Sequence, residues 1–365
     1  MRDFSTAKRI VIKIGTQTLA GDHGVDIDYV ASVARQVKSL LDRNQQVVIV
    51  SSGAIGMGAT ELDLTGPVKA MKMRQACAAI GQPLLMAAYR KAFGEYNISV
   101  GQVLLTAEVL DHRQTYLNLR TAIETLLELG VVPIINENDS VSTDEIGTAF
   151  GDNDRLSALV ASKLDADLLI ILSDVDRLYD KNPREYSDAR PIDTVTEITD
   201  EIHKMAGGKG STYSTGGMKT KIHAAQIASQ AGCRIVLAHG RTEDIITRVL
   251  SGKPLGTLFL PQKKLSNRAR WILHSTPQGH LYIDDGALAA LKRHKSLLPS
   301  GITKVEGNFK AGDVVQINEQ IKAVVSLSSD QITAILGKHS SEIKTILGPD
   351  CRDVVAIPED IVVME

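Results

Sequence analysis

The sequence predicts an α/β protein whose open, mainly parallel sheet is sandwiched by helices, followed by a small domain of mixed β structure. Apolar runs of strand length alternate with segments of helical period over residues 1–262, as in sheets built from βαβ units. Beyond residue 275 the strand-like pieces are short and separated by Gly and Pro, which is typical of small β modules. We therefore expect domains at 1–262 and 276–365, joined by a polar linker at 263–275.

The individual elements follow from the same patterns. In the first domain the expected strands are residues 9–14, 46–50, 98–106, 131–135, 168–172, 234–238 and 257–260. The expected helices are residues 29–42, 67–96, 113–129, 155–164, 218–231 and 242–250. In the second domain we expect strands at 281–283, 313–317 and 321–326 and helices at 287–293 and 341–347.

Length and composition indicate a globular protein. The 365 residues are enough for two cores, and 43% hydrophobic with 23% charged residues is ordinary for such proteins. No apolar run approaches membrane-spanning length, and the short run near the N-terminus reads as a strand, so we expect a cytoplasmic protein with no membrane partner. The three cysteines, Cys77, Cys233 and Cys351, are far apart and have no metal-binding spacing.

The charge distribution gives no basic domain. The net charge is −2, and residues 271–365 carry 9 Lys and Arg against 12 Asp and Glu. Binding to a nucleic-acid backbone usually needs a basic excess.

The segment 131–174 is the most informative part of the chain. Two apolar runs of strand length enclose a stretch rich in Asn, Asp and Gly. Its second half leads into a helical pattern, so Asn153 or Asp154 is expected to cap the helix start. A capped turn alone would also explain this short motif.

Four loops should meet at the carboxyl ends of the parallel strands, where ligands bind in such sheets. They are residues 13–16, 52–54, 136–154 and 215–221. Glycines and helix starts in these loops would form an anion site. Lys13 and Lys221 on two sides of one cleft suit phosphoryl transfer, which needs fixed cations, and Asp154 could hold both ammonium groups.

Several familiar sites are excluded by their missing motifs. The chain has no GxxxxGK[ST], no GxGxxG after the first strand and no GxSxG. The P-loop, dinucleotide-binding and serine-hydrolase readings therefore lose support. A nucleotide site of another design remains.

Six motifs in this order resemble the amino acid kinase family. They are VIKIGT, VSSGAI, PIINENDSV, FGDNDRLSALVA, LSDVDRLY and TGGMKTKIHAA, and the resemblance covers residues 9–261. The tail, with NRARWI leading to LLPSGITKVEGNFKAGDVV, resembles the PUA domain. Nearly the whole chain is covered by the two resemblances.

The resemblance implies transfer of the γ-phosphoryl group of ATP to the side-chain carboxylate of L-glutamate, the first step of proline biosynthesis. This acceptor has a pKa of about 4.3 and is already ionised at neutral pH, so no general base is needed. Kinases of aspartate, N-acetylglutamate, carbamate and uridylate are the rivals within the family. The NEND segment, FGDND and the tail argue against them by resemblance.

The resemblance also implies roles for individual residues. The catalytic set is Lys13, Asp154 and Lys221, and the glutamate-binding set is Ser52, Asp139 and Asn153. The ATP-binding set is Lys13, Ser173, Asp174, Thr215, Gly216, Gly217, Met218, Lys219, Thr220 and Lys221. Mg²⁺ would bridge phosphate oxygens, and no protein ligand is assigned to it.

Four of these assignments have plainer alternatives. Lys13 could extend from its strand end to solvent. Asp139 could serve only an Asx turn, and Ser52 only a turn or cap. Asp174 could simply end a strand.

The family further suggests feedback inhibition by proline, assembly into homodimers or tetramers, and hand-over of the product to glutamyl phosphate reductase. RNA binding by the tail is the alternative from another functional class. The acidic tail argues against it, although Lys292, Arg293 and Lys295 form a local basic group. A structural or regulatory appendage is the favoured interpretation of the tail.

Overall fold

The computed structural model describes residues 2–21, 24–111, 113–141, 153–206, 217–349 and 351–364. The chain forms two compact units, Met1–Lys264 and Leu265–Glu365, so the first unit extends two residues beyond the end expected at 262. No helix in the described ranges is both long and apolar enough to span a membrane.

The first unit is built on an eight-stranded sheet with the order β10-β12-β11-β7-β1-β4-β6-β5. Six neighbouring strands, from β11 to β5, run parallel, and β12 is antiparallel to β11. The strands are β1 Arg9–Ile14, β4 Gln46–Val50, β5 Val100–Leu105, β6 Val132–Glu137, β7 Leu168–Ser173, β10 Thr194–Val195, β11 Arg234–His239 and β12 Thr257–Phe259. The predicted parallel sheet is therefore present.

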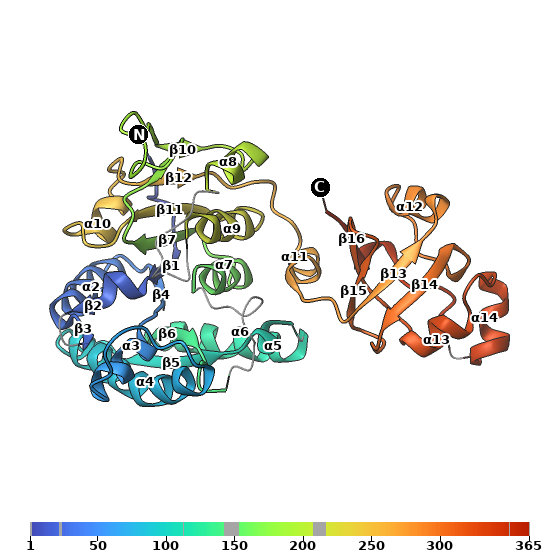
Figure 1. The fold of residues 1–365 in the computed structure, drawn as a ribbon, viewed down its shortest axis with the longest axis horizontal. Helices are drawn as coiled ribbons and strands as arrows, with labels where there is room; N and C mark the ends of the chain where they lie inside the picture. The colour runs from blue at the N-terminus through green and yellow to red at the C-terminus, as the bar shows by residue number, and fades with distance from the viewer. Residues whose placement is uncertain are drawn as a thin grey trace. The chain divides into compact units, whose positions relative to one another are not determined.

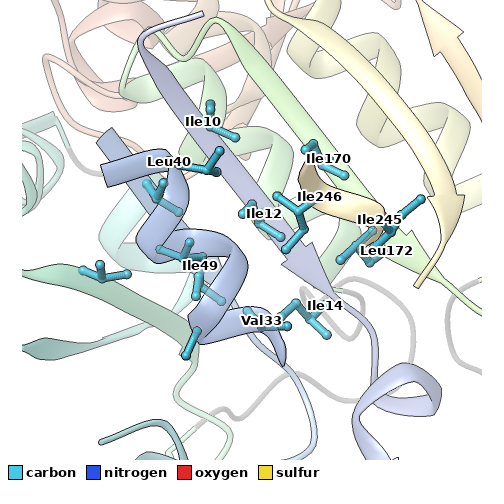
Figure 2. Close-up of a cluster of buried hydrophobic side chains, with 14 of the residues drawn as sticks. Ile10, Ile12, Ile14, Val33, Leu40, Ile49, Ile170, Leu172, Ile245 and Ile246 are labelled. Carbon is cyan, nitrogen blue, oxygen red and sulfur yellow. The ribbon is translucent and has the colours of Figure 1, made fainter. Parts of the chain in front are cut away.

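The central strands are buried on both faces because their sequences are continuous apolar runs. In β1, Ile12 pairs with Ile49 of β4 on one side and with Ile170 of β7 on the other. Figure 2 shows these side chains on one face of the sheet, packed against Val33 and other residues. Burying each such side chain contributes about 1.5–3 kcal/mol, so this core fixes where the strand ends lie.

Helices cover both faces of the sheet (Figure 1). One face packs on α2 Ile27–Leu41, α4 Met71–Gly94 and α10 Ile245–Leu250. The other face packs on α5 Ala107–Asp111, α6 Arg113–Glu128, α7 Asn153–Lys163 and α9 Met218–Ser229. The short helices α1 Thr16–Leu19 and α8 Asp200–Met205, and the small pairs β2 Ala20–Gly21 with β3 Gly24–Val25 and β8 Leu178–Tyr179 with β9 Pro191–Ile192, complete the unit.

Helix α3, Ala54–Glu61, begins at the last residue of the loop expected at 52–54. Gly58 of α3 serves close packing against α4. A Cβ atom on Gly58 would lie 1.9 Å from the carbonyl oxygen of Cys77 in α4, and one on Gly81 would lie 1.8 Å from that of Ala54. Glycine at both positions therefore allows α3 and α4 to approach closely, although it lowers helix propensity.

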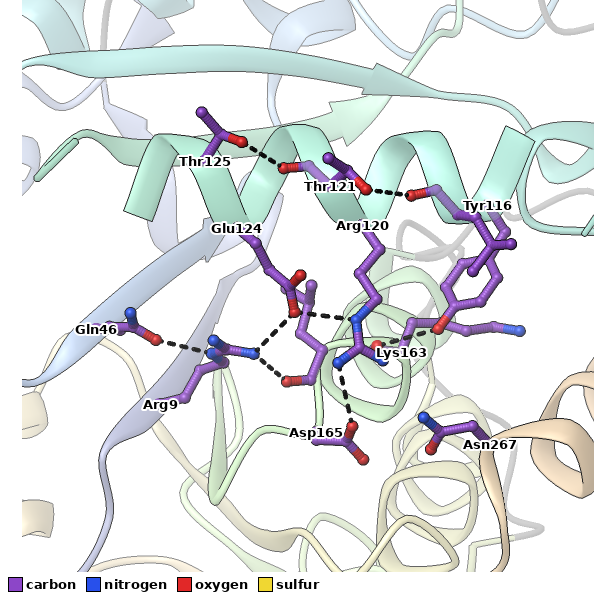
Figure 3. Close-up of polar contacts among 12 residues, drawn as sticks. Arg9, Gln46, Tyr116, Arg120, Thr121, Glu124, Thr125, Lys163, Asp165 and Asn267 are labelled. Carbon is purple, nitrogen blue, oxygen red and sulfur yellow. Dashed lines mark hydrogen bonds and ion pairs between the residues drawn. The ribbon is translucent and has the colours of Figure 1, made fainter. Parts of the chain in front are cut away.

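A network of polar side chains connects α6 to the amino end of β1 (Figure 3). This edge of the sheet is opposite the strand ends that form the predicted site. Arg9, at the start of β1, donates to Gln46 at 2.9 Å and to the carbonyl oxygen of Leu164 at 2.5 Å. Glu124 of α6 accepts from Arg120 at 2.9 Å and lies 3.8 Å from the guanidinium group of Arg9, which links the helix to β1. These partly exposed contacts hold elements together at an edge that is not part of the site.

The second unit contains a five-stranded sheet with the order β14-β13-β15-β16-β17. Its strands are β13 Gly279–Ile283, β14 Ile302–Gly307, β15 Val314–Ile317, β16 Ile321–Val324 and β17 Ile361–Val363. Its helices are α11 Asn267–His274, α12 Asp285–Leu291, α13 Ser329–Ala334 and α14 Ser340–Leu347, with 3₁₀ turns at Pro299–Gly301 and Pro358–Asp360.

Much of the stretch expected as a linker, residues 263–275, is the helix α11. Ser266 caps its start by accepting a hydrogen bond from the backbone of Ala269. Trp271 and Ile272 are buried against Val314 and Val324 of the second sheet. The polar and basic composition of this stretch predicts a linker, whereas the burial of Trp271 and Ile272 on one face of the helix docks it on the sheet.

Candidate active site

A cavity of about 330 Å³ lies at the carboxyl ends of the parallel strands. Residues from or just after β1, β4, β6 and β7 line it, together with the starts of α3, α4 and α7 and one residue of α9. The lining residues are Lys13, Gly15, Thr16, Gln17, Thr18, Ser52, Gly53, Ala54, Ile55, Gly56, Val68, Arg74, Asn136, Glu137, Asp139, Asn153, Ser173, Asp174 and Lys221. The sheet end predicted to bind ligands therefore carries a polar cavity.

Two buried lysines share one buried carboxylate in this cavity. Lys13 Nζ lies 2.5 Å from Oδ1 of Asp154, and Lys221 Nζ lies 3.0 Å from Oδ2. Thr220 adds a hydroxyl donor to Oδ2 at 3.2 Å. Asp154 is 0% exposed and each lysine is 5% exposed, so the group carries two cations for one anion in a largely water-free setting.

The charge state of Asp154 follows from these contacts. Burial raises the pKa of the carboxyl group, but the charges and hydrogen bonds of Lys13 and Lys221 outweigh it and hold the pKa well below its ordinary value. Asp154 is therefore ionised at neutral pH, and it fixes the direction of both ammonium groups.

Asp154 and Asn153 do not act as the helix cap expected from the sequence, because both lie inside the first turn of α7. The side-chain amide of Asn153 donates to the carbonyl oxygen of Ser51 and the hydroxyl of Ser52, each at 2.8 Å, and to Oδ1 of Asn136 at 3.1 Å. Its own Oδ1 is buried and accepts no hydrogen bond from the described residues. Tertiary contacts thus turn both side chains toward the cavity.

Asp139 and Arg74 place opposite charges in the cavity lining. Burial raises the pKa of the Asp139 carboxyl group, and the nearby positive charge of Arg74 opposes that rise. Arg74, in the first turn of α4, is half-buried. The cavity therefore offers both an anionic and a cationic group to a zwitterionic ligand.

Two helices that contribute first-turn residues to the cavity lining have glycine as the N-cap residue. Gly53 starts α3 with φ of 98°, a conformation that favours glycine, and Gly217 starts α9. Glycine has no side chain to accept from the first N–H groups, which leaves them for an anion. Ser173 and Asp174 follow β7 at the same edge, and the Ser173 hydroxyl donates to Asp174 at 2.9 Å.

The structure brings most of the expected site residues together. Lys13, Ser52, Asp139, Asn153, Ser173, Asp174 and Lys221 line the cavity, and Thr220 contacts Asp154. Gly217, Met218 and Lys219 begin α9. Thr215 and Gly216, and the Gly151–Asp152 part of the FGDND motif, lie outside the described residues.

Sequence reasoning did not single out several residues that line the cavity. Asn136 and Glu137 lie within the NEND segment and had a signal in the sequence, namely polar residues at the end of an apolar strand. Arg74 had none, because one arginine at the start of a long helix is usually a solvated residue. Gln17 and Thr18 follow directly on the expected loop 13–16, which already included Thr16.

Comparison with known proteins identifies the fold and its family. The model for "Amino acid kinase family" matches residues 8–239. The chain belongs to the amino acid kinase family. The model for the PUA domain matches residues 279–347, within the second unit.

Relatives with the name glutamate 5-kinase match most of this chain. One from Methanosarcina acetivorans is 48% identical over 86% of this chain and 84% of its own length. One from Caldanaerobacter subterraneus is 45% identical over 88% of each chain, and one from Geobacter sulfurreducens is 48% identical over 86% of this chain and 85% of its own.

A solved structure has the same fold at low sequence identity. The carbamate kinase from Giardia lamblia matches with a TM-score of 0.51 and 18% identity, over 71% of this chain and all of that one. At 18% identity this match shows a shared fold and nothing further. The three relatives above are more similar to this chain in sequence, at 45–48% identity.

Proposed function

We propose that this chain transfers the γ-phosphoryl group of ATP to the side-chain carboxylate of L-glutamate, giving γ-glutamyl phosphate for proline biosynthesis. The observation that carries the proposal is the buried group Lys13–Asp154–Lys221 at a polar cavity. Two fixed cations are suited to the charge that spreads over a transferring phosphoryl group. The relatives named glutamate 5-kinase support the choice of acceptor.

The acceptor needs no base, since a carboxylate is already ionised at neutral pH. Catalysis then rests on positioning and on charge neutralisation. Lys13 and Lys221 would contact the transferring group, and Asp154 would orient them through the contacts at 2.5 and 3.0 Å. Removal of one such preorganised donor typically lowers kcat by about 10²–10³.

Glutamate would bind through complementary charges in the cavity lining. Its ammonium group would donate to Asp139 and to the buried Oδ1 of Asn153, which has no donor among the described residues. Its α-carboxylate would pair with Arg74, and the side-chain carboxylate would lie near Ser52 and the start of α3. This arrangement pairs the ammonium group of glutamate with hydrogen-bond acceptors of the protein, and its carboxylates with donors.

ATP would bind on the β7 and α9 side of the cavity, through Ser173, Asp174 and the segment that includes Thr215, Gly216 and residues 217–221. The start of α9 would face the phosphates. In the described ranges no three metal-ligating side chains gather in one place. When bound, Mg²⁺ supplies charge neutralisation, and phosphate oxygens and water would be its main ligands.

The test is ATP-dependent formation of γ-glutamyl hydroxamate in the presence of Mg²⁺ and hydroxylamine, which traps an acyl phosphate. We expect a signal with L-glutamate and none with aspartate, N-acetylglutamate or UMP, with ADP release as a second readout. The signal should disappear in Lys221→Ala and Asp154→Ala. Product from another acceptor would overturn the substrate, and no phosphoryl transfer at all would reject the kinase assignment.

The remaining partners follow from this function. We propose that proline, a compact relative of glutamate, competes at the same cavity through Asp139. Homodimers or tetramers, a cytoplasmic location and hand-over of product to glutamyl phosphate reductase belong to the same proposal. For the PUA domain we favour a structural or regulatory role, and salt-dependent retention of the chain on RNA would instead support RNA binding.

A further inference from the structure

Gln82 in α4 lies one side chain away from the cavity and ends a chain of buried amide groups. Its Oε1 accepts a hydrogen bond from Nδ2 of Asn136 at 2.9 Å. Asn136 lines the cavity, whereas Gln82 does not. Gln82 and Asn136 are 8% and 1% exposed, so water has little access to this contact.

The orientation of each amide group in the chain is set by backbone groups. Asn136 Oδ1 accepts from the N–H of Glu137 at 2.9 Å, which can only donate. Its Nδ2 must then face Gln82. At the other end Asn153 donates to the carbonyl oxygen of Ser51, which can only accept, and to Asn136 Oδ1 at 3.1 Å.

This order leaves one polar atom of the two asparagines without a partner among the described residues, while Gln82 Nε2, outside the cavity lining, also has none. Because Asn153 Nδ2 is used by Ser51, Ser52 and Asn136, its Oδ1 is the atom without a donor among the described residues. A substrate ammonium group needs such an acceptor. The amide chain therefore presents an acceptor rather than a donor to the amino end of the substrate.

We propose that Gln82 is a positioning residue for substrate, acting through Asn136 to hold the Asn153 carbonyl oxygen toward the substrate ammonium group. Without Gln82 the Nδ2 group of Asn136 would be a buried donor without its acceptor, a state that costs about 1–3 kcal/mol and favours displacement of the Asn136 side chain toward another acceptor. The pair Asn136–Asn153 would then lose its fixed order. This inference rests on the proposed glutamate kinase activity.

The test is Gln82→Met, which keeps the size of the side chain and removes both polar atoms. We expect the KM for glutamate to rise about tenfold, with kcat and the KM for ATP changed less than threefold. A KM for glutamate within twofold of the unsubstituted chain would overturn the inference. No hydroxamate signal in the unsubstituted chain would instead reject the proposed function itself.

A matched control separates positioning from folding. Gln36 in α2 is also a buried glutamine, 4% exposed, but its Oε1 accepts from the backbone N–H of Ile246 at 2.9 Å, away from the cavity. Gln36→Met should lower the thermal midpoint of unfolding and leave the KM for glutamate unchanged. An equal rise of KM in both variants would show a general effect of destabilisation and overturn the proposal.

A double substitution tests the route through Asn136. Asn136→Ala should raise the KM for glutamate by itself. If Gln82 acts through Asn136, adding Gln82→Met to this variant should change the KM less than twofold further. If the two substitutions act independently, their effects on KM multiply, and that result would contradict the proposal. Gln82→Glu retains oxygen acceptors for Asn136 and decides the question if Gln82→Met does not fold. A KM within threefold of the unsubstituted chain supports the proposal, and a tenfold rise at unchanged stability overturns it.

Discussion

Asp154→Asn should destabilise the first unit more than any other single change at the cavity. The carboxylate is fully buried and lies 2.5 Å from one ammonium group and 3.0 Å from the other. Asparagine fills the same space but removes the negative charge that both buried ammonium groups contact. Removing one partner of a buried ion pair costs about 3–5 kcal/mol, so we expect a loss of that size in the free energy of unfolding.

Urea denaturation measures this loss, and the chain offers an internal control. Far-UV circular dichroism follows mainly the helices of the first unit, whereas the only tryptophan, Trp271, lies in α11 of the second unit. With an m-value of about 3 kcal/mol/M, the circular dichroism midpoint should fall by roughly 1–1.7 M. The Trp271 fluorescence midpoint should stay within error of the unsubstituted chain.

An anionic ligand distinguishes charge repulsion from lost packing. A non-hydrolysable ATP analogue should raise the midpoint of Asp154→Asn by more than that of the unsubstituted chain, because it supplies the missing negative charge near both lysines. Equal midpoints for the two proteins without ligand would refute the reasoning. The reasoning would also be refuted if the midpoint of Asp154→Asn is lowered but the analogue raises it by no more than it raises that of the unsubstituted chain.

The other predictions concern activity. Lys221→Met should lower kcat by about 10²–10³ with a smaller loss of urea midpoint than Asp154→Asn, since Lys13 still pairs the carboxylate; a kcat within fivefold would contradict the role of Lys221. The raised pKa of Asp139 means that its carboxylate loses charge at a higher pH than a free aspartate, so kcat/KM for glutamate should begin to fall sooner on acidification than in Asp139→Asn, and coincident pH profiles would count against it. Arg74→Met should raise the KM for glutamate about tenfold and leave that for ATP unchanged; the reverse pattern would move Arg74 to the nucleotide. Glu124→Gln, in the network of Figure 3, should leave hydroxamate formation unchanged and lower stability by less than about 1 kcal/mol, which makes it a surface control.

Local patterns were enough to predict most of the first unit. The run RIVIKI is β1 with the expected bounds, Arg9–Ile14, because a continuous apolar run of six residues is typical of a buried parallel strand. The helix expected at 113–129 is α6, Arg113–Glu128, and Gly130 follows it with φ of 72°, the conformation for which glycine is favoured.

The predictions failed where tertiary packing overrides local preference. The loop expected at 52–54 gives way to helix α3 at Ala54, and Gly58 further along that helix packs directly against the backbone of α4. Trp271 and Ile272 in the polar stretch after residue 262 are buried by strands more than 40 residues further along the chain. Neither outcome can be read from neighbours in the sequence.

The sequence by itself determined the residue types of the site and the edge of the sheet at which they would lie. Lysines at a strand end and after a Gly-rich stretch, together with an aspartate at a helix start, predicted a cationic group, because the carboxyl ends of parallel strands meet at one edge. Only the tertiary structure decided which atoms meet. Asp154 bridges Lys13 and Lys221 from 141 and 67 positions away, and Gln82 lies 54 positions from Asn136. Such pairings depend on the register of strands and the crossing of helices, which are set by packing of the whole core and not by any short segment.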